Sequence, residues 1–432
     1  MPPRGGIMPV LQVVPASNPH RGEEDFMPAC PGRRCGSRQR TMSACACQRK
    51  RRRRVALDAA LVDALGDEQG GDILTEDQNS DSDADLPDAA IVASLGPQIN
   101  AAPLRPSRSI LDASSEVLIM RLQDLQAPAC FIKLLHRILQ VCPVKQCLTH
   151  AEYFAGVKEV TAAHQRAGHV VASFELEDGD DESQNLLSNI GFINACRISC
   201  SVIDGGATTS APVCSSFVFM NSGTSARNVC FPLGDETIPS VAAANIMVAR
   251  VLLLQWIFMC RMIFSVLEQP ASSMMQYHDQ FQEFLRMFPL WRHSVNMGDF
   301  GADTQKSSWL YSTHACISHV DLFESTMVSA TKKKLAETGV NGITGKKTIN
   351  GTKDLKGSQA YTPQFALALT QAYLQNSATI RGVAKAVALR TLRTLRKDGP
   401  RELQKMDRAC QWWKAAKLDQ VFAYMGVDSD FA

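Results

Sequence analysis

The sequence lacks an uninterrupted apolar stretch long enough to span a membrane. Its longest uncharged apolar run, VLLLQWIFMC, lies between Arg250 and Arg261 and has only about half of the ~20 residues that a spanning helix requires. The first residues, MPPRGGIMPV, also lack the apolar centre of a secretory signal. We therefore expect no membrane partner and a reducing compartment, the nucleus or the cytoplasm, and we interpret the apolar run as a buried helix.

The spacing of cysteines typical of zinc sites is also missing, although the chain has 14 cysteines. No CxxC pair occurs. Cys45 and Cys47 form CxC, and Cys196 and Cys200 are four residues apart, but neither pair has a second pair at zinc spacing. Most of these thiols are expected to be free and to pack as small core residues. The sequence predicts no metal site.

Periodic apolar spacing is missing from the first hundred residues or so. They contain the basic run RKRRRR at residues 49–54, the acidic run EDQNSDSDAD at residues 76–85, many prolines and glycines, and few aromatics. Such a segment buries too little apolar surface to offset the entropy lost on ordering. We predict that residues 1–108 are mostly disordered. RKRRRR is either a nuclear import signal or a generic basic run, and the sequence leaves both open.

From residue 109 onward, predicted strands and helices alternate. Apolar residues at three-to-four spacing predict helices in EVLIMRLQDLQ, FIKLLHRILQVC, KEVTAAHQRA, DESQNLLSNIGF, HDQFQEFLRMF and residues 240–260. Strands are predicted in LTHAEYF, HVVASF, CRISCSVI, ATTSAPV, MIFSVLEQP, LWRHSVN and SWLYST. This alternation is typical of βαβ units with a mostly parallel sheet. We expect an α/β domain at residues 109–376 and a basic helical tail at residues 377–432.

Polar residues of possible function follow directly after the predicted strands, where parallel sheets place their ligands. Gly156 in YFAGVKEV would let a ligand approach the backbone at a helix N-terminus, and Glu175, about twenty residues further on, is placed to accept ribose hydroxyls. An ordinary turn and a solvated acid are the alternatives. Lys158 stands where a second glycine would complete the glycine motif.

Cys214 and Glu268 end two further predicted strands. A thiol in the turn APVCSSF could act as a nucleophile if its surroundings lower its pKa. A partly desolvated carboxyl at the end of VLEQP could hold a proton near neutral pH. The alternatives are a buried structural cysteine and a surface glutamate.

The order of these segments resembles that of the DNA methyltransferases that form 5-methylcytosine from S-adenosylmethionine. The family has an F-x-G-x-G turn, a ribose-binding acid, a P-P-C-Q turn, an E-N-V strand end, a G-x-P-Q-x-R-x-R segment and a late N-A-V-P helix. Here the corresponding segments are YFAGVKEV, Glu175, PVCSSF, LEQP, FGADTQKSSWLY and SQAYTPQFALALTQAY. The resemblance covers residues 148–373 and implies a Rossmann-type methyltransferase fold with a mostly parallel sheet flanked by helices.

The resemblance also implies roles for individual residues. Cys214 would add to C6 of a cytosine flipped out of the duplex, and Glu268 would stabilise the adduct through N3. The residues implied to bind S-adenosylmethionine are Phe154, Gly156, Glu175 and Pro212.

Several motif positions differ from the family pattern. Val213 and Ser215 replace a proline and a glutamine, Gln269 and Pro270 replace Asn-Val, and the segment QKSSW keeps the glutamine but has neither arginine. An alternative function is therefore a catalytically inactive methyltransferase fold that serves as a nucleic-acid-binding or scaffold module.

A lysine-rich segment at residues 331–357 carries seven lysines against Glu337 and Asp354. It predicts either a basic loop that contacts phosphates without reading sequence or a merely soluble loop. The residues expected to contact nucleic acid are Gln305, Lys306, Lys332, Lys333, Lys346 and Lys347. In the tail, we expect the pair Trp412 and Trp413 to pack rather than to stack on bases.

Overall fold

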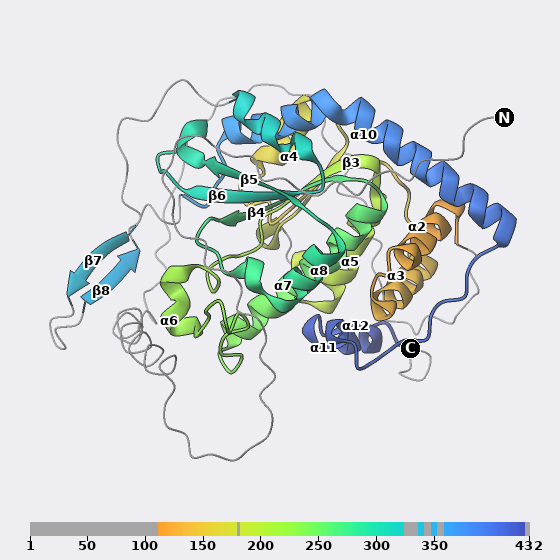
Figure 1. Cartoon of the computed structure of the whole chain (residues 1–432), viewed down its shortest axis with the longest axis horizontal. Coiled ribbons are helices and arrows are strands. Elements are labelled where there is room, and N and C mark those ends of the chain that lie inside the picture. Colours follow the sequence, from red (N-terminus) through yellow and green to blue (C-terminus); the bar gives the residue numbers. More distant parts are fainter. Residues whose placement is uncertain (1–110, 179–181, 324–335, 341–346, 352–357, 428–432) are drawn as a thin grey trace, which may run out of the picture. The chain divides into compact units, whose positions relative to one another are not determined.

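The computed structural model describes residues 111–178, 182–323, 336–340, 347–351 and 358–427 (Figure 1). The segment predicted to be disordered, residues 1–108, lies outside these residues, as do Lys332, Lys333 and Lys346. The described chain contains an α/β domain built on a six-stranded sheet, which confirms the predicted fold class at this level.

The sheet has the strand order β2-β1-β3-β4-β6-β5. Strands β1 to β4 are parallel, and β6 runs antiparallel to both of its neighbours, so the sheet is mixed. The strand bounds are β1 Leu148–Tyr153, β2 Val171–Phe174, β3 Val202–Ser210, β4 Phe264–Pro270, β5 Trp291–Asn296 and β6 Ser307–Ser312. The chain places β2 on one side of β1 and β3 on the other, which creates a switch point where ligands of open α/β sheets bind.

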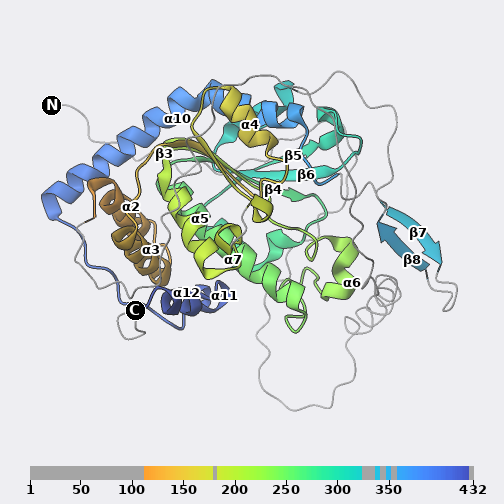
Figure 2. The same ribbon diagram turned by 180° about the vertical axis from the view of Figure 1, so that it is seen from behind.

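Helices lie on both faces of the sheet (Figures 1 and 2). One face carries α5, Asn189–Ser201, together with α7, Pro239–Cys260, and α8, Asp279–Met287. The other face carries α4, Glu159–Arg166, and the long α10, Pro363–Asp398. The remaining helices are α2, Ala113–Asp124, α3, Ala129–Val141, α6, Ser222–Ser225, α11, Gln411–Ala415, and α12, Leu418–Tyr424.

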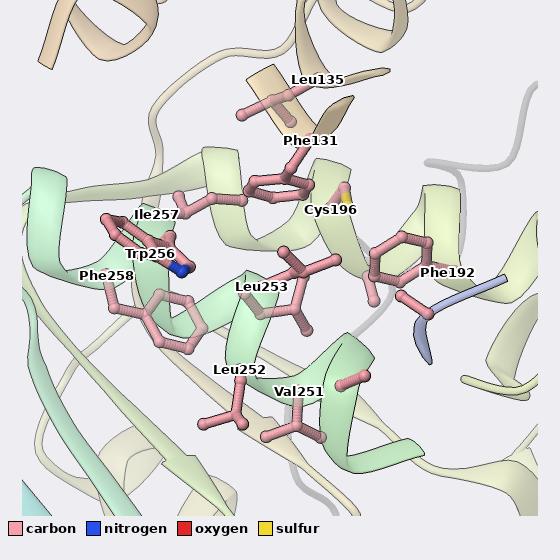
Figure 3. Packing of buried hydrophobic residues seen from close by; sticks show 14 of the residues in the cluster. Phe131, Leu135, Phe192, Cys196, Val251, Leu252, Leu253, Trp256, Ile257 and Phe258 are labelled. Carbon is pink, nitrogen blue, oxygen red and sulfur yellow. The ribbon is translucent and has the colours of Figure 1, made fainter. Parts of the chain in front are cut away.

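The core forms two layers, one on each face of the sheet. Because side chains alternate along a strand, β4 contributes to both: Phe264 and Val266 pack in the layer with α10, and Leu267 packs in the layer with α7. Figure 3 shows the second layer, in which aromatic and aliphatic side chains of α3, α5 and α7 meet. Both faces of the sheet are therefore buried, as the apolar strands require.

Helix α7 contains the longest apolar run and is buried, as predicted. By length and composition alone it could cross a membrane, but 78% of its most apolar window lies inside the protein. Arg250, in its middle, is fully buried. Its guanidinium donates to the carbonyls of Leu186, Leu187 and Ser188 at 2.8–2.9 Å and to that of Ala416 at 3.0 Å. These bonds satisfy the buried charge and tie the C-terminal region to the core.

Two sequence assignments before β3 are wrong. The helix predicted in DESQNLLSNIGF begins only at Asn189, because Ser188 caps it by accepting from the N–H of Gly191 at 2.9 Å. The strand predicted in CRISCSVI is instead the end of α5, and the strand itself begins at Val202. Cys196 and Cys200, four residues apart, are both buried on this helix. Their spacing reflects a core-facing helical stripe.

Helix α10 runs without a break through the predicted domain boundary at residues 376 and 377. Thr362 caps its start by accepting from the N–H of Phe365 at 3.1 Å. The helix crosses β3 at Gly205, which has a left-handed φ of +70°. The hydroxyl of Tyr373 donates to the carbonyl of Gly205 at 3.0 Å. The basic half of this helix therefore continues directly from the half that covers the sheet.

Two further parts of the C-terminal region differ in detail from the prediction. Within the lysine-rich segment, β7, Ala336–Val340, and β8, Lys347–Gly351, form an antiparallel pair where a loop was expected. In the tail, Trp412 is 1% exposed and its indole donates to Glu283 at 3.0 Å. Trp413 packs beside Phe422. The prediction that the tryptophans pack is therefore confirmed.

The crossing of α10 over β3 predicts a strong effect of Gly205→Ala. A Cβ at this position would lie 2.8 Å from the Cα of Arg381, and the left-handed backbone disfavours any side chain. We expect a loss of about 2–4 kcal/mol in the free energy of unfolding, measured by urea denaturation. Gly382→Ala is the matched control, because nothing lies within 4 Å of a Cβ there. It should stabilise the helix by about 0.5–1 kcal/mol. Equal effects of the two changes would contradict the close crossing.

Candidate functional site

The residues singled out after the strands meet at the carboxyl edge of the sheet. Tyr153 at the end of β1 lies beside Phe174 of β2 and Ser210 of β3, and Ser210 in turn lies beside Leu267 of β4. The segments that follow these four strands therefore emerge together, around the switch point between β1 and β3.

The turn after β1 has an unusual backbone. Phe154, Gly156 and Lys158 all have left-handed φ angles, of 60°, 52° and 61°. The N–H of Gly156 donates to the Glu175 carboxylate at 2.7 Å, which joins the turn to the end of β2. A Cβ added at Gly156 would have nothing within 4 Å, so there is open space beside this glycine. The pair expected to contact a nucleoside cofactor is thus brought together.

Lys158 occupies the position of a missing glycine but keeps a glycine-like conformation. Its backbone is left-handed and it forms the N-cap of α4. Its ammonium pairs with Asp178 at 2.5 Å, and its side chain is 42% exposed. The lysine therefore preserves the path of the turn, at a cost in backbone strain of about 1 kcal/mol.

Glu152 is a buried acid at the same edge that the sequence analysis did not select. It is 1% exposed. Its Oε2 accepts from the N–H and the hydroxyl of Thr161, at 2.7 and 2.6 Å, while its Oε1 has no hydrogen-bond partner. Burial raises the pKa of Glu152 to about 7. The side chain therefore changes charge near neutral pH.

Cys214 follows β3 and Glu268 lies within β4, and these two strands are parallel neighbours, as predicted. Cys214 lies four residues after the end of β3 and is half-buried, whereas Glu268, within β4, is only 4% exposed. Gln269 connects their segments, because its amide donates to the carbonyl of Pro212 at 2.9 Å and its oxygen accepts from Ser273 at 2.9 Å. Gln269 thus fixes the thiol-bearing turn to β4.

Lys306 supplies the positive charge between these two groups. Its ammonium lies 3.4 Å from Oε1 of Glu268, and the hydroxyl of Ser308 donates to the same oxygen at 2.5 Å. Burial raises the pKa of the Cys214 thiol, Lys306 opposes that shift and Glu268 adds to it. The thiol, the carboxylate and the ammonium therefore form one electrostatic group.

Tyr361 completes the group from the segment that precedes α10. Burial first, and then the carboxylates of Glu268 and Glu152, hold the pKa of its phenol well above the ordinary range. A neutral hydroxyl is thus kept close to both acids and to Cys214. Such a donor can contact a ligand that enters between the carboxylates.

The remaining residues predicted to bind nucleic acid do not join this group. Gln305 packs its side-chain amide against the backbone of Gly298. Lys347 begins β8, and Lys332, Lys333 and Lys346 lie outside the described residues. Of that predicted set, the structure therefore places only Lys306 beside the site, among the residues that it describes.

Three residues of the site, Glu152, Ser308 and Tyr361, were not among those predicted from the sequence. The sequence contained an indication of Glu152, because a charged residue inside the apolar strand LTHAEYF must be buried with a hydrogen-bond partner close by. For Ser308 it contained none, since its contact depends on the antiparallel pairing of β6 with β4. Tyr361 lay within SQAYTPQF, a segment noted only for its resemblance to a family motif.

Chemically, the described part of the edge offers the thiol of Cys214, the phenol of Tyr361, the carboxyl groups of Glu152, Glu175 and Glu268, the ammonium of Lys306 and the ion pair of Lys158 with Asp178. Within the described residues, no group of three or more His, Cys, Asp or Glu side chains is arranged to hold a metal ion. The arrangement suits an organic ligand with cationic character beside β1 and β2, and covalent chemistry at Cys214.

Comparisons with protein-family models, with curated proteins and with solved structures found no match for this chain.

The buried carboxyl of Glu152 predicts a dependence of stability on pH. Its folded pKa lies above the ordinary value of 4.5, so the folded state holds the proton more tightly. The associated stabilisation is complete below pH ~4.5 and is lost as the pH rises through ~7, by up to about 3 kcal/mol. Glu152→Gln should remove this loss between pH 5 and 7.5, measured by urea denaturation at each pH. Glu402→Gln, a control at an exposed position, should show the same pH-dependent loss of stability as the wild type. A full pH dependence in Glu152→Gln would contradict the assignment.

Proposed function

We propose that this protein is an S-adenosylmethionine-dependent methyltransferase-like protein that acts on cytosine in nucleic acid. The proposal includes the finer fold class, a Rossmann-type methyltransferase fold. The observation that carries it is the meeting, at one sheet edge, of the Gly156–Glu175 pair with the Cys214–Glu268 pair. The sequence resemblance assigns the first pair to the cofactor and the second to the reacting base.

The electrostatics of the edge suit a sulfonium cofactor. S-adenosylmethionine carries a positive sulfur, and the edge presents the carboxylates of Glu152, Glu175 and Glu268. Of the two ammonium groups that the described residues place at this edge, that of Lys306 lies 3.4 Å from Glu268 and that of Lys158 pairs with Asp178. The carboxyl of Glu152 has a pKa of about 7, so a cation bound beside it would shift the side chain from the protonated to the ionised form. Glu175 would accept ribose hydroxyls in place of, or beside, its bond from Gly156.

The proposed chemistry uses Cys214 and Glu268 together. The Cys214 thiolate forms a bond to C6 of cytosine, and the proton held by Glu268 at N3 neutralises the charge that this addition develops. S-adenosylmethionine bound beside C5 would supply the methyl group that bonds to this carbon and would leave as the neutral thioether. Loss of the C5 proton to a base and breakage of the C6–sulfur bond would then restore the ring and the thiolate, with the N3 proton returned to Glu268. Lys306 favours the thiolate because its charge opposes the effect of burial.

One observation favours the alternative function, an inactive fold that binds nucleic acid or serves as a scaffold. Burial dominates at Cys214 and raises the pKa of its thiol, whereas a nucleophilic cysteine generally has a lowered pKa. In that case the edge would bind the cofactor or a nucleic acid without forming a covalent adduct.

The cofactor half of the proposal predicts binding of S-adenosylmethionine that Glu175→Ala weakens. Loss of a charged hydrogen-bond acceptor costs ~1.5–3 kcal/mol, so the dissociation constant should rise by about tenfold or more in isothermal titration calorimetry of the full chain. Glu177→Ala, an exposed acid in the same segment, is the matched control and should bind normally. No heat and no thermal shift at millimolar cofactor would exclude cofactor binding.

The catalytic half predicts a covalent complex with an oligonucleotide that contains 5-fluorocytosine. Fluorine at C5 cannot leave as a proton does, so the enzyme remains attached through Cys214, and a band of higher mass should appear in denaturing gels when cofactor is present. Cys214→Ser should abolish this band. Cys147→Ser, an exposed thiol before β1 at the opposite edge, should retain it. Cofactor binding without any adduct would instead support the inactive fold or another methyl acceptor.

A further inference from the structure

A second cavity lies at the other end of the sheet from the proposed site. It has a volume of about 370 Å³ and is bounded by α2, by the second half of α10 and by the segments that lead into β3 and β4. Asp204 near the start of β3 and Arg261 just before β4 line it. Because the strands are parallel, these residues belong to the amino edge of the sheet, and none of the residues proposed for methyl transfer lines the cavity.

The lining combines a charged end with an apolar wall. Arg121, Arg261 and Lys385 contribute positive charges, against the single carboxylate of Asp204. The wall is formed mainly by Val117 and Leu118 of α2 and by Ala384, Ala388, Leu389 and Leu392 of α10. A site of this size, mostly apolar with a few convergent polar groups, has the properties of small-molecule sites.

Arg261 is the central feature of the charged end. It is only 4% exposed. Its Nη1 donates to the carbonyl of Val202 at 3.1 Å and lies 3.8 Å from Asp204, too far for a hydrogen bond. With its amide turned so that its oxygen faces Arg261, Gln146 accepts from both terminal nitrogens of the guanidinium, and Nε is left without a partner. Most of the donors of Arg261 are therefore satisfied within the protein, while its positive charge lies in the lining of the cavity.

Arg121 increases the excess of positive charge. Its Nε is buried and also has no partner, and burial lowers the pKa of its guanidinium. The carboxyl of Asp204 interacts with both arginines, and burial raises its pKa, which weakens it as a counter-ion. Among the lining residues, two guanidiniums and the ammonium of Lys385 therefore face one carboxylate, an excess of positive charge that a bound anion would balance.

We propose that this cavity binds an amphipathic monoanion, namely a carboxylate on a short hydrocarbon chain. The carboxylate would contact Arg261 and Arg121, for which planar, two-oxygen ligands are well matched. The hydrocarbon chain would cover the wall formed by α2 and α10. An inorganic anion such as phosphate would satisfy the arginines but leave the apolar wall in contact with water.

Isothermal titration calorimetry of the full chain with sodium octanoate tests this proposal. We expect saturable binding with one site, and weaker binding of 1-octanol and of inorganic phosphate, each of which supplies only half of the required chemistry. Arg261→Gln should weaken octanoate binding by about tenfold or more. Arg286→Gln, an exposed arginine on α8, is the matched control and should leave binding unchanged.

A second variant separates loss of the site from loss of the fold, since Arg261 also holds the Val202 carbonyl. Ala388→Phe keeps every charge and fills the cavity from α10, so it should abolish octanoate binding while the urea midpoint stays at or above that of the wild type. Absence of octanoate binding to the wild type would overturn the proposal. So would binding that persists in Ala388→Phe, or octanol binding as tightly as octanoate. A phosphate preference over octanoate would indicate a simple anion site instead.

Discussion

The parallel pairing of β3 with both β1 and β4 is the interaction on which the candidate site depends. Ser210 lies opposite Tyr153 on one side and opposite Leu267 on the other, so β1 and β3 end at the same level and β4 continues beyond it to Pro270. A shift of β3 by one residue would turn its side chains to the opposite faces and separate Cys214 from Glu268. The site is therefore specified by strand register first and by the identity of its side chains second.

Helix α10 connects the two ends of this sheet. Tyr361, two residues before its first turn, lies beside Glu268 and Glu152 at the carboxyl edge, whereas Ala384 and Leu392 of the same helix line the cavity at the amino edge. The helix is fixed between these points by its close crossing at Gly205. The same helix therefore borders both the candidate site and the cavity.

Most strands and helices could be predicted because each carries its own local pattern, as the apolar run of α7 and the alternation in β1 do. The errors arose where two patterns coincide: Cys196, Ser199 and Cys200 form a core-facing helical stripe that also looks like a short strand. Of the site, the residues after parallel strands could be predicted from order alone. The contacts of Ser308 and Lys306 with Glu268 could not be predicted, because they depend on the antiparallel pairing of β6 with β4, a strand far away in the sequence.

In the proposed mechanism, the location of the proton shared by Cys214 and Glu268 distinguishes an active enzyme from an inactive fold. With the thiol protonated and the carboxyl ionised, the pair carries one negative charge, which Lys306 balances at 3.4 Å. The state required for attack on cytosine, a thiolate beside a protonated carboxyl, carries the same net charge, so moving one proton between the groups leaves the balance with Lys306 intact. Removing the Glu268 charge also removes one of the influences that raise the pKa of the thiol. A base whose N3 accepts a hydrogen bond would favour the protonated carboxyl, and so the binding of cytosine itself would promote the thiolate that attacks it.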